Sequence, residues 1–227
     1  MSKKGFTLAE VLVTLGVIGV VSAITLPTLI KNYNKYVTAQ RLKKAYSEIQ
    51  NAVRLSTIEN GEPNQWDITF KFTGVKNFVK TYYLPFFKSS KEITNYQFYN
   101  LNGYKNIYPY LSIQISNCTV LSFYGETLYS AWLFVDINGK SNPNRIGRDI
   151  FVLNYYNNKK FIPVFYGSDR DISSIINSGN TISDEQRDTN RDGMGCSDKN
   201  KNGFYAGFYC GALIQLNNWE IPKDYPW

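Results

Sequence analysis

The chain of 227 residues contains no histidine, only three cysteines and only two methionines. Without histidine it lacks the side chain that most often serves as a general base or metal ligand near neutral pH. The sequence signatures of nucleophilic hydrolases, phosphate-binding loops, dinucleotide-binding folds and zinc sites are also missing. We therefore expect a protein that is not an enzyme.

Charge is missing from one long stretch, because residues 11–30 contain no Asp, Glu, Lys or Arg. Twenty helical residues rise about 30 Å, the thickness of a bilayer's hydrocarbon core. Lys3 and Lys4 precede this stretch, and the carboxylate of Glu10 lies at its head. A carboxylate in hydrocarbon is costly, so we expect Glu10 to have a partner.

Three interpretations of this start compete. A signal peptide would be cut after Ala23, in the small-residue sequence Val21-Ser22-Ala23. A plain membrane anchor would keep its charge-free stretch uncut. A short leader cut after Gly5 would leave the apolar helix in the mature chain. We favour the third interpretation, because it accounts for Glu10 and for a helical pattern that continues past residue 31.

The hexapeptide Gly5-Phe6-Thr7-Leu8-Ala9-Glu10 resembles the type III leader motif of type IV pilins and type II secretion pseudopilins. The resemblance covers about the first 30 residues of the chain. It implies that a prepilin peptidase cuts between Gly5 and Phe6 and methylates the new amine, which gives N-methylphenylalanine. It also implies that Glu10 is the family's assembly glutamate and that Pro27 is the proline at which the helix often bends.

Elementary electrostatics predicts the same role for Glu10. After cleavage the positive amine of Phe6 lies about one helical turn from the negative carboxylate of Glu10, and each charge is costly alone in hydrocarbon. An amine of a neighbouring subunit that meets Glu10 would neutralise both charges and fix the register. The expected partners are therefore the peptidase, other pilin copies and the cytoplasmic membrane.

The pattern changes in residues 31–59 to an amphipathic helix, which the stop signal Asn60-Gly61-Glu62-Pro63 ends. Apolar residues there recur at steps of three and four: Tyr33, Tyr36, Val37, Leu42, Ala45, Ile49, Ala52, Val53, Leu55 and Ile58. We predict one helix over residues 6–60, transmembrane in its first half and amphipathic in its second. Residues 1–5 form the leader and residues 61–227 a globular head.

Alternation of apolar and polar residues in the head predicts β-strands. We expect a short helix at 75–83 and strands at 111–116, 119–124, 128–137, 149–156 and 159–166. The first strand should be half-buried, and Pro163 makes the last an edge strand. Residues 136–149 are interpreted as a hairpin connection, with a calcium loop as the alternative. The fold class is α+β, in which the long helix packs on an antiparallel sheet, as in pilins.

A calcium ion is the one cofactor that the sequence suggests. Asp188, Asn190 and Asp192 alternate and precede a glycine, like the start of a calcium loop, and Asp198 lies one residue before the twelfth position. The alternative is a polar turn. Calcium is known in several pilins and pseudopilins, so the resemblance favours the ion slightly.

The three cysteines, Cys118, Cys196 and Cys210, allow three pairings, each of which leaves one free thiol. We choose Cys196 with Cys210, which would close a loop of about 15 residues and stabilise by about 3 kcal/mol. This pair also resembles the C-terminal disulfide loop of many pilins. Cys118 is then expected to be a small packed residue. The aromatic, proline-rich C-terminus is expected to dock on the sheet edge.

The net charge of +7 falls to +5 when the leader leaves with Lys3 and Lys4 (7 − 2 = 5). We interpret this mild excess as solubility, and nucleic-acid binding in DNA uptake remains a weaker alternative. The sequence thus predicts a single-pass protein of the cytoplasmic membrane, with an extracytoplasmic head, that later enters a cell-surface or periplasmic filament. The alternative is a secreted binding domain released near Ala23, with calcium-dependent binding as one form of this alternative.

Overall fold

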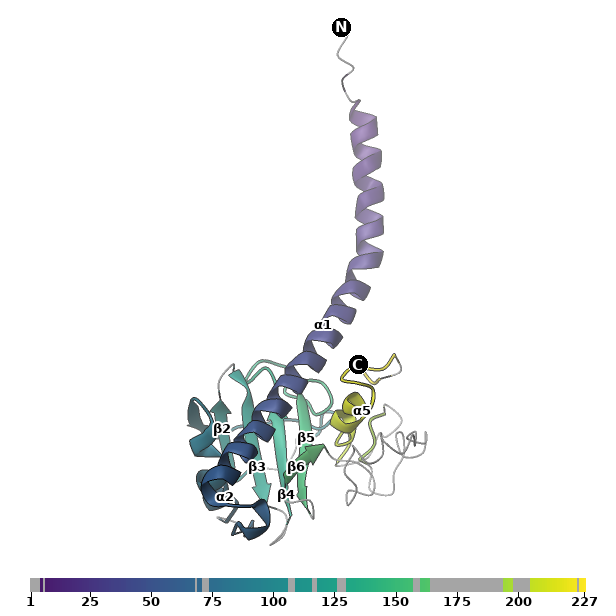
Figure 1. Ribbon diagram of the computed structural model, residues 1–227. Helices are drawn as coiled ribbons and strands as arrows, with labels where there is room; N and C mark the ends of the chain where they lie inside the picture. Colours follow the sequence, from purple (N-terminus) through teal and green to yellow (C-terminus); the bar gives the residue numbers. More distant parts are fainter. Residues whose placement is uncertain are drawn as a thin grey trace. The chain divides into compact units, whose positions relative to one another are not determined.

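The computed structural model forms two compact units, Met1–Val37 and Thr38–Trp227. It describes residues 5, 7–67, 69–70, 74–105, 109–115, 118–125, 130–156, 160–163, 194–197, 205–223 and 225–227. The elements are α1 (Leu8–Asn60), η1 (Pro63–Gln65), α2 (Gly74–Tyr82), η2 (Leu84–Phe86), β1 (Ser90–Ile93), β2 (Leu111–Ile115), β3 (Val120–Gly125), β4 (Ala131–Asp136), β5 (Ile150–Tyr156), β6 (Lys160–Pro163) and α5 (Cys210–Leu216) (Figure 1).

The long helix α1 begins at Leu8 and ends at Asn60. Gly61 follows with a φ of +76°, a left-handed conformation that glycine adopts without the steric cost of a Cβ atom. Pro63, at the start of η1, lies just beyond. The helix therefore ends at the stop signal that the sequence predicts.

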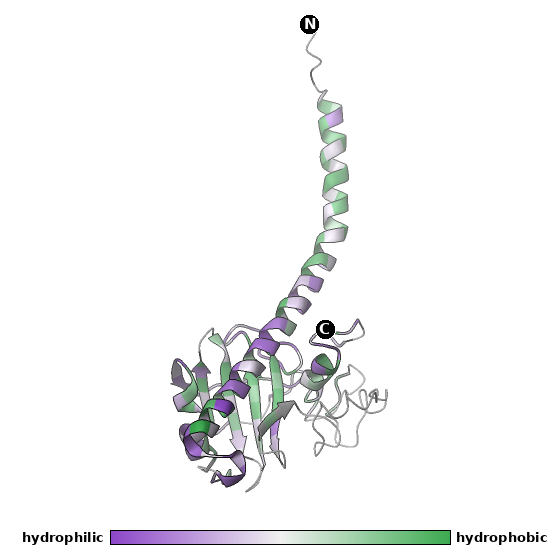
Figure 2. Ribbon diagram, viewed as in Figure 1, coloured by the Kyte–Doolittle hydropathy of each residue, from purple (hydrophilic) through white to green (hydrophobic). Residues whose placement is uncertain are grey.

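Within the larger unit, residues 38–60 of α1 cover one face of the sheet (Figure 1). Figure 2 shows polar and apolar residues alternating around this segment, as in an amphipathic helix. Its buried residues recur at steps of three and four: Ala39, Leu42, Ala45, Ile49, Ala52 and Ser56. Tyr33, Tyr36 and Ile58 belong to the same sequence pattern but are 65%, 64% and 75% exposed.

The sheet has six strands in the order β1-β2-β3-β4-β5-β6. Each neighbouring pair is antiparallel, so the chain forms a simple meander. The predicted short helix is α2, and the predicted edge strand that contains Pro163 is β6. The predicted strand at 128–137 corresponds to β4, which covers Ala131–Asp136, and residues 128 and 129 lie outside the described residues. The α+β class with a long helix on an antiparallel sheet is confirmed.

Both faces of the sheet are covered, which the sequence did not predict. Alternate residues of β4 belong to two different apolar clusters, Leu133 and Val135 to the first and Trp132 and Phe134 to the second. The first cluster includes the buried face of α1, and the second includes aromatic residues that precede β2 or follow residue 204. Neighbouring side chains of a strand point to opposite faces, so each cluster lies on its own face.

Because both faces of the sheet are covered, most of strand β2 is buried on its polar side as well as its apolar side. It was expected to be half-buried, but Ser112 on its polar side is only 4% exposed. Ser112 lies opposite Ser122 of β3, and the two hydroxyls form a hydrogen bond of 2.8 Å. A buried hydroxyl needs such a partner. Ser112 therefore faces a second buried layer rather than water, while Gln114 is partly exposed.

The C-terminal segment packs on the head, as predicted. Trp219, Ile221 and Trp227 pack against the first apolar cluster. The buried Tyr225 hydroxyl donates a hydrogen bond of 2.6 Å to the carbonyl of Gly147. The side chain of Tyr225 is 5% exposed, so this end of the chain forms part of the core.

Candidate functional site

The first turn of α1 is a capping box that involves Glu10. The backbone N–H and the hydroxyl of Thr7 each donate a hydrogen bond of 2.8 Å to Oε2 of Glu10. In return, the Glu10 N–H donates to the Thr7 hydroxyl oxygen at 3.3 Å. The motif Thr-x-x-Glu at a helix start satisfies donors that the helix would leave free. The spacing of Thr7 and Glu10 is visible in the sequence, but its capping role was missed.

Residues 11–30 of the first unit form an exposed apolar helix. Leu8 is 78% exposed and Ile24 is 70% exposed, and Figure 2 shows mainly hydrophobic residues all round this part of α1. The hydroxyls of Thr14 and Thr25 each donate a hydrogen bond of 2.9 Å to a carbonyl of the preceding turn. Polar groups satisfied within the helix reduce the cost of hydrocarbon surroundings. By length and composition, α1 is able to cross a membrane.

The predicted processing residues fall at the edge of this helix. Gly5 lies before it, Phe6 lies outside the described residues, and Pro27 lies inside α1. The predicted calcium residues Asp188, Asn190, Asp192 and Asp198 lie outside the described residues. Among the residues that the structure describes, no three His, Cys, Asp or Glu side chains are grouped to hold a metal ion.

Cys196 and Cys210 form a disulfide, with their Cα atoms 4.9 Å apart. This is the pairing chosen from the sequence. Both residues are buried, at 2% and 0% exposure. Cys118 was expected to be packed, and that prediction was wrong because its free thiol is exposed. Cys118 precedes β3 with a φ of +65°, so it belongs to the turn between β2 and β3 rather than to a strand.

Two buried carboxylates flank the connection between β4 and β5, which is a hairpin connection as interpreted from the sequence. Asp136 accepts hydrogen bonds from the Tyr96 hydroxyl and from the Asn138 N–H. Burial raises the pKa of Asp136 to about 7, although these hydrogen bonds oppose the shift. Asp149 accepts the N–H groups of Asn144 and Arg145 at 2.8 and 2.7 Å, and burial raises its pKa as well.

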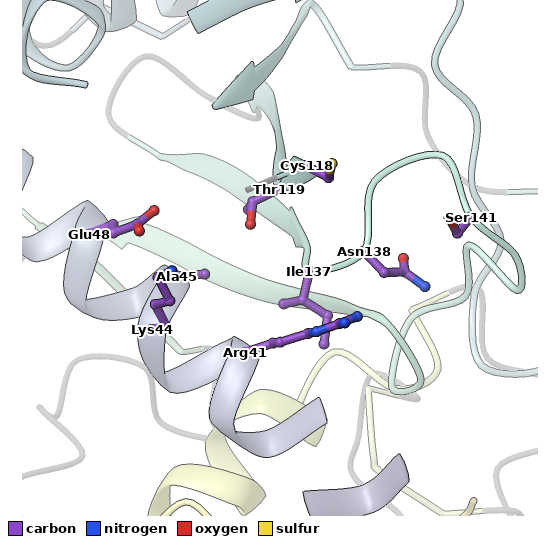
Figure 3. A pocket seen from close by; sticks show the side chains of 9 residues that line it. All are labelled: Arg41, Lys44, Ala45, Glu48, Cys118, Thr119, Ile137, Asn138 and Ser141. Atoms are coloured by element: carbon purple, nitrogen blue, oxygen red, sulfur yellow. The ribbon is translucent and has the colours of Figure 1, made fainter. Parts of the chain in front are cut away.

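A cleft of about 560 Å³ opens beside this connection in the larger unit (Figure 3). Its walls come from α1, from the turn before β3 and from the β4–β5 connection. The lining residues are Arg41, Lys44, Ala45, Glu48, Cys118, Thr119, Ile137, Asn138 and Ser141. No sequence pattern indicated this cleft, because its walls are far apart along the chain.

The first unit has the features of a class of protein, the pilins and pseudopilins. Residues 1–26 match the family model described as the prokaryotic N-terminal methylation motif, which is the signature of type IV pilins and pseudopilins. This confirms the resemblance noted in the sequence. The motif, the apolar helix and the α+β head are together those of a pilin-like protein.

Residues 28–227 match the model of a family of unknown function (DUF6613). Because that match covers most of the chain, the protein belongs to this family. The comparison with curated proteins gave no match, and the comparison with solved structures gave none either.

Proposed function

We propose that this protein is a structural subunit, pilin or pseudopilin, of a type IV pilus-like or type II secretion-like filament. The observation that carries the proposal is the methylation motif at residues 1–26, which contains most of the exposed apolar part of α1. In this proposal the role is assembly rather than catalysis.

A prepilin peptidase is proposed to cut between Gly5 and Phe6 and to methylate the amine of Phe6. Residues 1–5 are then the leader, 6–60 the stem helix and 61–227 the head. The precursor crosses the cytoplasmic membrane once, with its head outside the cytoplasm, and then joins other pilins in the filament. An apolar helix with 0% of its most hydrophobic segment buried needs either lipid or other helices around it.

Mass spectrometry of the N-terminus of the protein from its native host tests the processing step. We expect a chain that starts at methylated Phe6, and an unprocessed chain when the prepilin peptidase gene is deleted. A chain that starts at Ile24 would overturn the proposal in favour of a secreted domain. A chain that keeps Met1 in both strains would overturn it as well.

The assembly role of Glu10 requires a variant that separates its charge from its capping role. Glu10→Gln removes the charge, while glutamine is also accepted at this position of a capping box. Thr7→Ala removes the cap and leaves the charge. Glu48→Gln removes a carboxylate in the second half of the same helix and serves as the matched control.

We expect Glu10→Gln to insert in the membrane normally but to enter filaments at least tenfold less than wild type. An uncompensated charge in an apolar core costs several kcal/mol, so the neighbouring amine loses its partner in this variant. Thr7→Ala should assemble better than Glu10→Gln, and Glu48→Gln should assemble normally. Sheared-filament immunoblots give the measurement, and wild-type incorporation of Glu10→Gln would refute the pairing.

A further inference from the structure

The cleft of Figure 3 collects hydrogen-bond donors from three segments of the larger unit. Arg41 and Lys44 come from α1, Thr119 from the residue before β3, and Ser141 from the β4–β5 connection. Arg41 and Lys44 are three positions apart and so lie on one helix face. In Figure 3, Arg41 reaches from the helix toward Ile137 and Asn138, and the Thr119 hydroxyl points toward the helix.

Among the described residues, no ion pair joins Arg41 or Lys44 to a carboxylate. Glu48 is the one carboxylate among the lining residues, so these side chains carry a net charge of one positive at neutral pH. The surroundings of Arg41 and Lys44 therefore favour an anion over a cation.

The walls of the cleft are held in place by local contacts. Gly139 has a φ of +71°, and a Cβ atom there would lie 2.5 Å from the carbonyl oxygen of Cys118. Glycine thus lets the β4–β5 connection pack directly on the turn before β3. The Asn138 N–H donates to Oδ1 of the buried Asp136 at 2.9 Å, which fixes the other side of the same wall. Because the backbone of this wall is ordered before a ligand binds, binding has a lower entropic cost.

We propose that this cleft binds a phosphate group, either inorganic or part of a phosphate ester. A planar carboxylate can be satisfied by one guanidinium through two parallel hydrogen bonds. A tetrahedral phosphate has oxygens directed several ways, and the cleft offers a guanidinium, an ammonium and two hydroxyls from three directions. The number of donors and their origin in three segments therefore suit phosphate better than carboxylate. This site is independent of filament assembly.

Cys118 supplies the reporter for a test, because it lines the cleft and the other two cysteines form the disulfide. The full chain in detergent is treated with iodoacetamide, a neutral reagent, and the alkylation rate of Cys118 is followed by mass spectrometry. We expect sodium phosphate to slow the reaction in a saturable manner. Potassium chloride at the same ionic strength should leave the rate unchanged, which separates binding from screening.

The variants are Arg41→Gln and Lys44→Gln, with Lys43→Gln as the matched control. Lys43 is an exposed cation on the same helix that does not line the cleft. Each cleft variant removes a charge-assisted hydrogen bond to the anion, so it should weaken phosphate protection at least tenfold. Lys43→Gln should protect like wild type. Equal alkylation rates without phosphate show that a variant keeps the wild-type fold around the thiol.

Three further probes decide the ligand class. Protection by glycerol 3-phosphate as well as by phosphate supports a phosphate-ester site, and protection by phosphate alone supports an inorganic phosphate site. Protection by acetate at equal or lower concentration than phosphate overturns the choice of phosphate. Absence of saturable protection by any of these anions, or equal loss of protection in the Lys43→Gln control, overturns the proposal.

Discussion

The buried carboxylate of Asp136 makes the stability of the head depend on pH in a direction that is unusual for an aspartate. Its side chain is 1% exposed, and burial raises its pKa from the ordinary 3.8 to about 7. The folded state therefore binds the proton more tightly than the unfolded state does. By linkage, the contribution of Asp136 to stability is greatest below pH 4, decreases as the pH rises from about 4 to 7, and then levels off.

The size of this effect follows from the two pKa values. Each tenfold change in proton affinity corresponds to about 1.4 kcal/mol. The change from 3.8 to about 7 thus corresponds to a decrease of up to about 4 kcal/mol in the free energy of unfolding. Asp149 adds to the decrease, because burial raises its pKa as well. The Tyr96 hydroxyl faces Asp136 and stays protonated throughout, because burial also raises its pKa.

Asp136→Asn tests this reasoning. The amide keeps an oxygen acceptor for the Asn138 N–H but has no carboxyl proton to lose. We expect the pH dependence of the unfolding free energy to flatten by most of that 4 kcal/mol between pH 4 and 8. Guanidinium denaturation of the full chain in detergent, followed by tryptophan fluorescence, gives the free energies. Glu59→Gln, at an exposed carboxylate, should keep the wild-type slope. An unchanged slope in Asp136→Asn would refute the argument.

Two other substitutions probe how the head is held together. Replacing Cys196 and Cys210 together by serine opens a disulfide with a sequence separation of 14, and should lower the free energy of unfolding by about 3 kcal/mol; guanidinium midpoints measure this, and an unchanged midpoint under oxidising conditions contradicts it. Gly139→Ala should cost at least about 2 kcal/mol, because alanine is strained at positive φ and its Cβ would meet the Cys118 carbonyl. Gly211→Ala is the control for Gly139→Ala, since its Cβ would have ordinary contacts in α5, and equal losses in both would contradict the strain argument.

The sequence predicted the elements that have a strong local signal. The end of α1 was predicted because Gly61 follows Asn60 directly and Pro63 lies two residues further on. The alternating strands were predicted because apolar residues recur at every second position. Strand β1 was missed, since its four residues are polar or only partly buried at the edge of the sheet. A strand of this kind gains its conformation from pairing with β2, which no local pattern reveals.

The cleft and the buried acids were beyond prediction for a related reason. Arg41 and Ser141 are separated by a hundred positions, and only the folded sheet brings their segments to one cleft. Burial of Asp136 depends on the second apolar cluster, which includes Tyr96 and Phe208. An aspartate two residues before an Asn-Gly pair, as in Asp136-Ile137-Asn138-Gly139, is usual for an exposed turn. Tertiary packing alone turned it into a buried group.

The capping box changes the argument about Glu10 without removing it. From the sequence alone, the cost of this carboxylate in hydrocarbon needed a partner subunit to offset it. In the structure, Thr7 already donates two hydrogen bonds to the carboxylate. Both bonds end on the same oxygen, Oε2, and both come from neutral groups. They satisfy one oxygen in part and leave the full negative charge in place.

In water the charge of Glu10 is solvated, and the cap alone is sufficient reason for a glutamate at this position. In hydrocarbon, or in a filament core of packed helices, an isolated charge remains costly whatever neutral donors surround it. Glutamine would therefore serve equally well in a soluble helix but not in an apolar core, and only the second case needs a cation from a neighbour.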